Sequence, residues 1–159
     1  MSPVRSLILW WRCSLRAKVK LQVLGRRMTN AEIGGAGEKL AEKWLKRQGR
    51  KVLYRNFAGP KGGEVDIVCR HRDTLTFVEV KTRTSEKFGR PANAVNLEKQ
   101  KLIQRGAREW MRMLNQPLIS FRFDIVEVIF AEGERPVIGV VENAFQLPQD
   151  HMQGRMKTV

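Results

Sequence analysis

Hydrophobic positions recur with a helical period in two stretches of the chain. The first stretch covers residues 33–48 and ends at Gly49, and the second begins after Pro91 and covers about 92–115. Apolar side chains three and four residues apart share one face of a helix and can be buried together. The pattern therefore predicts two amphipathic helices. The apolar face of the first consists of Ile33, Gly37, Leu40, Ala41, Trp44 and Leu45.

Shorter stretches rich in Val, Ile, Phe and Thr have the composition of β-strands. The second and third of them are separated only by a short polar turn, which predicts a hairpin. The order of elements is then α-β-β-β-α-β-β, which predicts an α/β fold of the α+β type, with a short central mixed sheet flanked by helices. The predicted strands cover residues 51–57, 64–70, 74–82, 121–130 and 136–145.

The first 27 residues differ in composition from the rest of the chain. They contain seven Lys or Arg residues and no acid. Their apolar run is too short for a secretory signal. We expect residues 1–30 to form a basic arm that is flexible, is an upstream extension of the reading frame before Met28, or lies as an amphipathic helix on a membrane surface or on phosphates. A folded domain over 31–147 and a frayed tail over 148–159 complete this expectation.

Charge and cysteine content narrow the class of protein. The 159 residues include 30 basic and 16 acidic side chains, and the resulting net charge of +14 favours a polyanionic partner such as nucleic acid. No apolar run approaches the ~20 residues that span a bilayer, so integral membrane association is not expected. Cys13 and Cys69 form no CxxC pattern, which excludes a disulfide framework and a zinc site and favours a reduced, cytoplasmic protein.

Ionic side chains interrupt two strands that are otherwise apolar. Asp66 lies in one strand of the predicted hairpin, and Glu79, Lys81 and Arg83 form a row on one face of the other. Mg²⁺ prefers hard oxygen ligands, so Asp66 and Glu79 could hold it while Lys81 orients the attacking water or stabilises charge on the phosphorane. This pattern suggests metal-assisted phosphodiester hydrolysis. A cross-strand salt-bridge row explains the same spacing.

Two further features lie on the predicted helices. Glu38 sits at the edge of the first apolar face, where it would suit a metal-bound water or be only a solvated glutamate. On the second helix, four basic side chains recur at helical spacing along one line, which we call the basic ridge. Such a ridge is suited to contact a phosphate backbone, although an ordinary solvated helix face has the same pattern. The basic ridge consists of Lys101, Arg105, Arg108 and Arg112.

Ordered motifs over about 31–146 resemble the YraN family of poorly characterised bacterial proteins. The motifs are Gly37-Glu38-x-x-Ala41, Arg55-Asn56, Gly63-Glu64-Val65-Asp66-Ile67-Val68, Phe77-Val78-Glu79-Val80-Lys81-Thr82-Arg83, Phe88-Gly89, Arg122-Phe123-Asp124 and Val141-Glu142-Asn143-Ala144-Phe145. That family is placed in the restriction-endonuclease-like superfamily with the PD-(D/E)xK signature, and is similar in pattern to archaeal Holliday-junction resolvases. The resemblance therefore implies a restriction-endonuclease-like core.

The resemblance also implies roles for particular residues. Asp66 and Glu79 match the metal ligands for Mg²⁺ or Mn²⁺, Lys81 matches the signature lysine, and Glu38 matches the helix-borne acidic residue of the resolvases. Val65 stands where a proline usually precedes the aspartate. A fold and a complete motif can nevertheless outlive an activity.

The hypothesis that follows is a Mg²⁺-dependent endonuclease acting on DNA, with branched or damaged DNA as candidate substrates and a role in DNA repair or recombination. The alternative is a catalytically weak or inactive nucleic-acid-binding module with the same fold. A peripheral membrane or adaptor protein that uses the basic arm is a third class. DNA is favoured over RNA as the partner, and a homodimer would be needed to cut two strands symmetrically.

Overall fold

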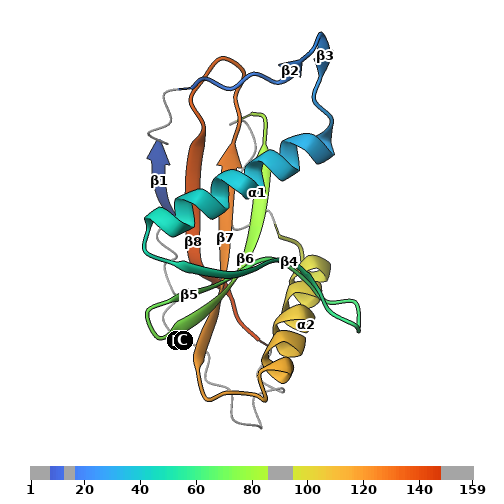
Figure 1. Cartoon of the computed structure of the whole chain (residues 1–159), viewed down its shortest axis with the longest axis vertical. Coiled ribbons are helices and arrows are strands. Elements are labelled where there is room, and N and C mark those ends of the chain that lie inside the picture. The colour runs from blue at the N-terminus through green and yellow to red at the C-terminus, as the bar shows by residue number, and fades with distance from the viewer. Residues whose placement is uncertain (1–7, 13–16, 86–94, 148–159) are drawn as a thin grey trace.

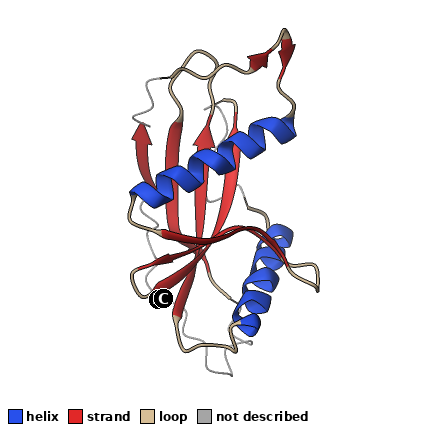
Figure 2. Cartoon of the chain, in the orientation of Figure 1, coloured by secondary structure: helices blue, strands red, loops and turns tan. Residues whose placement is uncertain are grey.

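A mixed β-sheet with one helix on each face organises the chain (Figures 1 and 2). The computed structural model describes residues 8–12, 17–85 and 95–147. Within these residues the main sheet has six strands in the order β1-β8-β7-β6-β5-β4, and a separate two-stranded hairpin is formed by β2 and β3. The helices are α1 (Asn30–Arg47) and α2 (Leu97–Met113). The strands are β1 (Ile8–Arg12), β2 (Gln22–Val23), β3 (Arg26–Arg27), β4 (Lys51–Ala58), β5 (Glu64–His71), β6 (Thr74–Arg83), β7 (Ser120–Ile129) and β8 (Val137–Phe145).

The predicted order α-β-β-β-α-β-β is confirmed from α1 to β8. Helix α1 begins at Asn30, three residues before the predicted start, because Thr29 and Glu32 form a capping box. Helix α2 begins at Leu97, where the Asn96 side chain accepts a hydrogen bond from the Lys99 N–H; the predicted residues 92–94 lie outside the described residues. Capping side chains therefore determine both helix starts.

The two helices cover opposite faces of the sheet. Neighbouring residues of β6 belong to different hydrophobic clusters: Val78 packs in the cluster that includes α1, and Phe77 packs in the cluster that includes α2. Because successive strand residues point to opposite faces, the sheet separates the two clusters. Figure 1 shows α1 crossing β8, β7 and β6. Neither helix is long and apolar enough to cross a membrane.

The centre of the sheet combines parallel and antiparallel pairing. Strands β6 and β7 are parallel, with α2 in the connection between them, while β4, β5 and β6 form an antiparallel meander. The β5–β6 pairing begins only at Ile67, opposite Val78. The first residues of β5 pair with β4 instead, so β5 separates from β6 beyond this point. We call this place the fork; in Figure 1, β4 and β5 turn aside while β6 continues along the sheet.

The fork changes which face one residue covers. Strand alternation predicts that Val65 shares a face with Ile67, but Val65 belongs to the α2 cluster and Ile67 to the α1 cluster. The reason is a close approach of two glycines. A Cβ on Gly63 would overlap the backbone of Gly106, so only glycine lets the start of β5 lie directly on α2.

The described part of the N-terminal segment packs against the domain, so the expectation of an unattached arm is wrong for these residues. Strand β1 pairs with β8 along the edge of the sheet and is not part of a helix. Leu21 is only 6% exposed and belongs to the α1 cluster, and its N–H donates to the Glu132 carboxylate. The Arg26 side chain forms a salt bridge with Glu32 of α1. Acids elsewhere in the chain thus pair with this acid-free segment. The predicted frayed tail, 148–159, lies outside the described residues.

Candidate active site at the fork of the sheet

The fork brings the two predicted carboxylates together. Asp66 lies just before the point where β5 meets β6, and Glu79 follows that point on β6. One carboxylate oxygen of Asp66, Oδ2, accepts a hydrogen bond of 2.7 Å from the Val80 backbone N–H. This side chain therefore takes the place of a neighbouring strand exactly where the regular β5–β6 pairing stops, and its position is fixed by the β6 backbone.

Glu79 is buried although it is ionic. It is 2% exposed, and its Oε1 lies 2.8 Å from the Lys81 Nζ. Its other oxygen, Oε2, is buried and has no hydrogen-bond partner among the described residues. A buried carboxylate oxygen without a donor is costly, so this atom is available to a ligand.

The neighbouring carboxylates change the titration of Asp66. Burial first, and then the charge of Glu79, raise the pKa of Asp66 to about 7, with a smaller contribution in the same direction from Glu38. The Val80 hydrogen bond and the charge of Lys99 act in the opposite direction. A pair of carboxylates in which one holds its proton near neutral pH is typical of functional sites.

Glu38 approaches this pair from the other layer of the fold. A Cβ on Gly37 would overlap the Thr82 side chain, so the glycine lets α1 approach β6 closely and brings Glu38 to its end. Glu38 and Lys81 both line a groove of about 480 Å³ between α1 and the end of β6. The structure therefore brings the four predicted residues Glu38, Asp66, Glu79 and Lys81 to one region.

Arg83 continues the row on β6 but is engaged by the next strand. Its Nε lies 2.7 Å from an oxygen of the buried Glu127 on β7. Burial raises the pKa of Glu127, and the charge of Arg83 acts to lower it. Arg83 lines the same groove as Glu38. It therefore serves a structural ion pair and lies at the border of the candidate site.

Lys99 is a member of the site that the sequence prediction missed. It extends from the first turn of α2, and its Nζ lies 3.3 Å from the Glu64 Oε2 and 3.5 Å from the Glu79 Oε2. Burial lowers the pKa of Lys99, but the charges of Glu79 and Asp66 and the hydrogen bond to Glu64 outweigh it, so the pKa is raised. The available signal was its position in line with Ile103 on the buried face of α2 rather than on the basic ridge.

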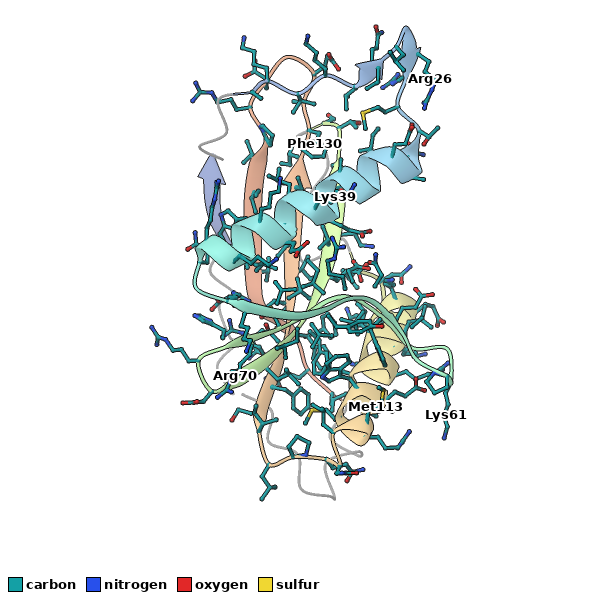
Figure 3. The ribbon with its side chains drawn as sticks, in the orientation of Figure 1. Arg26, Lys39, Lys61, Arg70, Met113 and Phe130 are labelled. Carbon is teal, nitrogen blue, oxygen red and sulfur yellow. The ribbon has the colours of Figure 1, made fainter. Side chains whose placement is uncertain are left out.

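The basic ridge divides into two parts. Arg105, Arg108 and Arg112 line a pocket of about 340 Å³ together with Lys61 from the β4–β5 turn, and Arg105 donates to the Lys61 carbonyl. Lys101 is exposed and lies 3.5 Å from Glu98 instead. Lys61, labelled in Figure 3 beside α2, was not predicted. Three of the four ridge residues thus form a cationic pocket with a residue from another element.

The donor set at the fork is suitable for magnesium. Mg²⁺ usually takes one or two protein carboxylates and keeps several waters, and both carboxylates here offer hard oxygen ligands. The buried, unpartnered oxygen of Glu79 supports this fit. Among the described residues, no three His, Cys, Asp or Glu side chains converge closely enough to form a complete cage. Asp66 and Glu79 would therefore hold the ion with water and substrate as the remaining ligands.

Fold and site together define a class of protein: a mixed α/β protein with a restriction-endonuclease-like core and a cluster of acids and lysines at the fork of its sheet. More particularly, the chain belongs to the uncharacterised protein family UPF0102, whose profile matches residues 37–128. This is the YraN family that the motifs indicated. The matched range contains every residue of the fork cluster and of the basic ridge.

Individual relatives agree with this family. The chain is 43% identical over 118 residues to a UPF0102 protein of Geobacter metallireducens, covering 74% of this chain and 95% of the relative. It is 40% identical over 119 residues to one of Caldicellulosiruptor saccharolyticus, covering 74% of this chain and 100% of the relative. It is 41% identical over 119 residues to one of Trichlorobacter lovleyi, covering 74% and 93%. The names of these relatives state no activity.

Proposed function

We propose that this protein is a Mg²⁺-dependent endonuclease that hydrolyses phosphodiester bonds in DNA, with branched or damaged DNA as the first substrates to test. The observation that carries the proposal is the buried carboxylate pair of Asp66 and Glu79 at the fork, with Lys81 on Glu79. Ionic groups on central strands are costly unless they serve a site. The cationic pocket on α2 supplies the charge that a DNA backbone requires.

Each residue of the site has a role in this reaction. When bound at Asp66 and Glu79, Mg²⁺ would act as a Lewis acid on the phosphate and lower the pKa of an attacking water. Lys81 is held by Glu79, so its ammonium can orient that water or stabilise the charge that develops on the phosphorus oxygens. Glu38, in the groove beside Lys81, can accept a proton from water.

A cleavage panel tests the proposal directly. Single-stranded, duplex, flap and four-way-junction DNA are incubated with the protein and Mg²⁺ or Mn²⁺. We expect Glu79→Gln to abolish cleavage by weakening metal binding, and Lys81→Met to abolish it while metal affinity remains, because a cation is not a ligand. Glu98→Gln, an exposed change on α2, is the matched control and should cleave normally. Wild-type protein that binds DNA but cleaves no substrate with either metal contradicts the proposal.

The second candidate is a nucleic-acid-binding module without catalysis. It is favoured by the charge balance at the fork, where Lys81 and Lys99 both lie beside Glu79 without any metal. In that case DNA binding depends on the cationic pocket alone, and added Mg²⁺ changes neither melting temperature nor affinity. A metal-dependent rise in melting temperature that Glu79→Gln removes would exclude this candidate.

A homodimer belongs to the endonuclease proposal only if both strands of a branched substrate are cut symmetrically. Sedimentation of the protein with and without a four-way junction measures this. Paired nicks at symmetric positions from a protein that stays monomeric on the junction would exclude the symmetric-dimer mechanism and leave the hydrolysis itself in place.

A further inference from the structure

A lysine from α2 already places a positive charge beside Glu79. The Lys99 Nζ lies between the carboxylates of Glu64 and Glu79, at 3.3 Å and 3.5 Å. Its backbone position is fixed, because the Lys99 N–H donates to the Asn96 side chain at the start of α2. The charge of Asp66 acts on it as well. Lys99 is thus the cation nearest to the Glu79 oxygen that a metal would use.

The two lysines beside Glu79 are bound differently. Lys81 lies 2.8 Å from Oε1, within hydrogen-bonding distance, whereas Lys99 lies 3.5 Å from Oε2 and satisfies no hydrogen bond to it. The Lys99 side chain is 24% exposed, while Glu79 is buried. A lysine ammonium on a four-carbon stem is mobile and strongly hydrated. Lys99 can therefore leave Glu79 toward solvent by rotation of its own side chain, without a change in the backbone.

We infer that Lys99 is an internal competitor of the divalent metal: its ammonium balances the acidic cluster in the metal-free protein and is displaced when the metal binds. The inference rests on the proposed function, because it concerns the same metal site. A divalent ion at Glu79 would place two positive charges within a few ångströms of the ammonium, and their repulsion disfavours joint occupancy. Lys81, which is hydrogen-bonded to the other oxygen, stays in place.

Displacement gives Lys99 a second partner. Once it leaves Glu79, its ammonium is free to contact a phosphate of DNA lying between the fork and the cationic pocket on the same helix. DNA that attracts Lys99 then removes the competitor and strengthens metal binding, and by linkage the metal strengthens DNA binding by the same factor. Lys99 therefore makes metal and DNA binding mutually dependent.

Calorimetric titration with Mn²⁺ in the absence of DNA tests the competition. Lys99→Met should bind Mn²⁺ at least tenfold more tightly than the wild type, because the competing charge is gone. Lys99→Arg keeps the charge and should retain the weak affinity. Lys101→Met is the matched control, since Lys101 is exposed on the same helix and pairs only with Glu98, and it should leave the affinity unchanged. Lys99→Gln replaces the methionine variant if the latter melts early.

A second titration tests the coupling. With a phosphorothioate duplex as the probe, the Mn²⁺ affinity of the wild type should increase, and that of Lys99→Met should not. Equal or weaker Mn²⁺ affinity in Lys99→Met, or the absence of Mn²⁺ binding in both proteins, overturns the inference. Cleavage by wild-type protein together with that result leaves the endonuclease proposal intact. Tighter binding by Lys99→Met without cleavage by any variant supports the inference and overturns the endonuclease proposal.

Discussion

Replacing Asp66 by Asn should remove a pH dependence from the stability of the fold. The carboxyl group of Asp66 faces Glu79 on β6, Glu38 on α1 and Lys99 on α2, and accepts a hydrogen bond from the Val80 N–H. Burial first, and then the charge of Glu79, raise its pKa from 3.8 to about 7. Asn keeps an oxygen that can accept the backbone hydrogen bond but has no proton to lose.

The sign of the effect follows from proton counts. Between pH 4 and pH 7 the folded protein holds a proton on Asp66 that the unfolded chain has already lost, so the free energy of unfolding falls as the pH rises. A difference of about 3 pKa units at 1.36 kcal/mol each gives at most ~4 kcal/mol, against a total stability of about 5–15 kcal/mol for a typical domain. The loss is complete above the folded-state pKa of about 7.

Urea unfolding at pH 5 and pH 8, in EDTA, measures this difference. Wild-type protein should lose stability between the two values, and Asp66→Asn should lose less by up to the same ~4 kcal/mol. Asp73→Asn is the control, because the Asp73 side chain is 99% exposed in the β5–β6 turn. Mg²⁺ should restore wild-type stability at pH 8 and do little at pH 5. Equal pH slopes in wild type and Asp66→Asn would refute the reasoning.

Three further predictions concern the surroundings of the site. Changing Arg105 and Arg108 to Ala should weaken DNA binding similarly across sequences and flatten the slope of log K against log salt by up to ~0.9 per phosphate contact, and an unchanged slope would make the ridge a solvated face. Replacing Asp124 by Ala leaves buried arginine charge unpaired, and should lower the free energy of unfolding by about 3–5 kcal/mol in urea titrations; a loss below 1 kcal/mol would contradict this. Deleting residues 1–27 removes the buried Leu21 and should lower the melting temperature by more than the ~4–8 °C that 1 kcal/mol represents in a small domain, whereas an unchanged melting temperature would mean that the segment contributes nothing.

Local patterns in the sequence were sufficient to predict the elements and much of the site. Alternation and composition identify all strands from β4 to β8, because each has a run of apolar residues bounded by turn residues. They also place Glu79 and Lys81 on one face of β6 and Asp66 on the neighbouring strand. These relations depend on residues two apart or on a hairpin with a short turn, which are properties of local sequence.

Features that depend on long-range packing were not predicted. The fork arises because Gly63 lies against Gly106, and nothing near either glycine indicates the other. Lys99 reads as one more cation on a basic helix until α2 is docked beside β6. The acid-free N-terminal segment looked unpaired because its partners, such as Glu132 for the Leu21 N–H, lie more than a hundred residues away.

Two buried ionic clusters in the described residues show why the fork, and not simply any buried charge, is the candidate site. Asp124 is fully buried, but both of its oxygens are satisfied: Oδ2 lies 2.6 Å from Arg50, and Oδ1 lies 2.9 Å from Arg122. A cluster of this kind is complete, and adding a ligand would only remove existing bonds. At the fork, Glu79 keeps a buried oxygen without a hydrogen bond and Asp66 has a raised pKa. Both features are costly in a central sheet, and a bound cation relieves both at once, because it supplies a ligand bond to the oxygen and favours the ionised form of Asp66. The unsatisfied cluster is therefore the one whose composition is explained by a ligand.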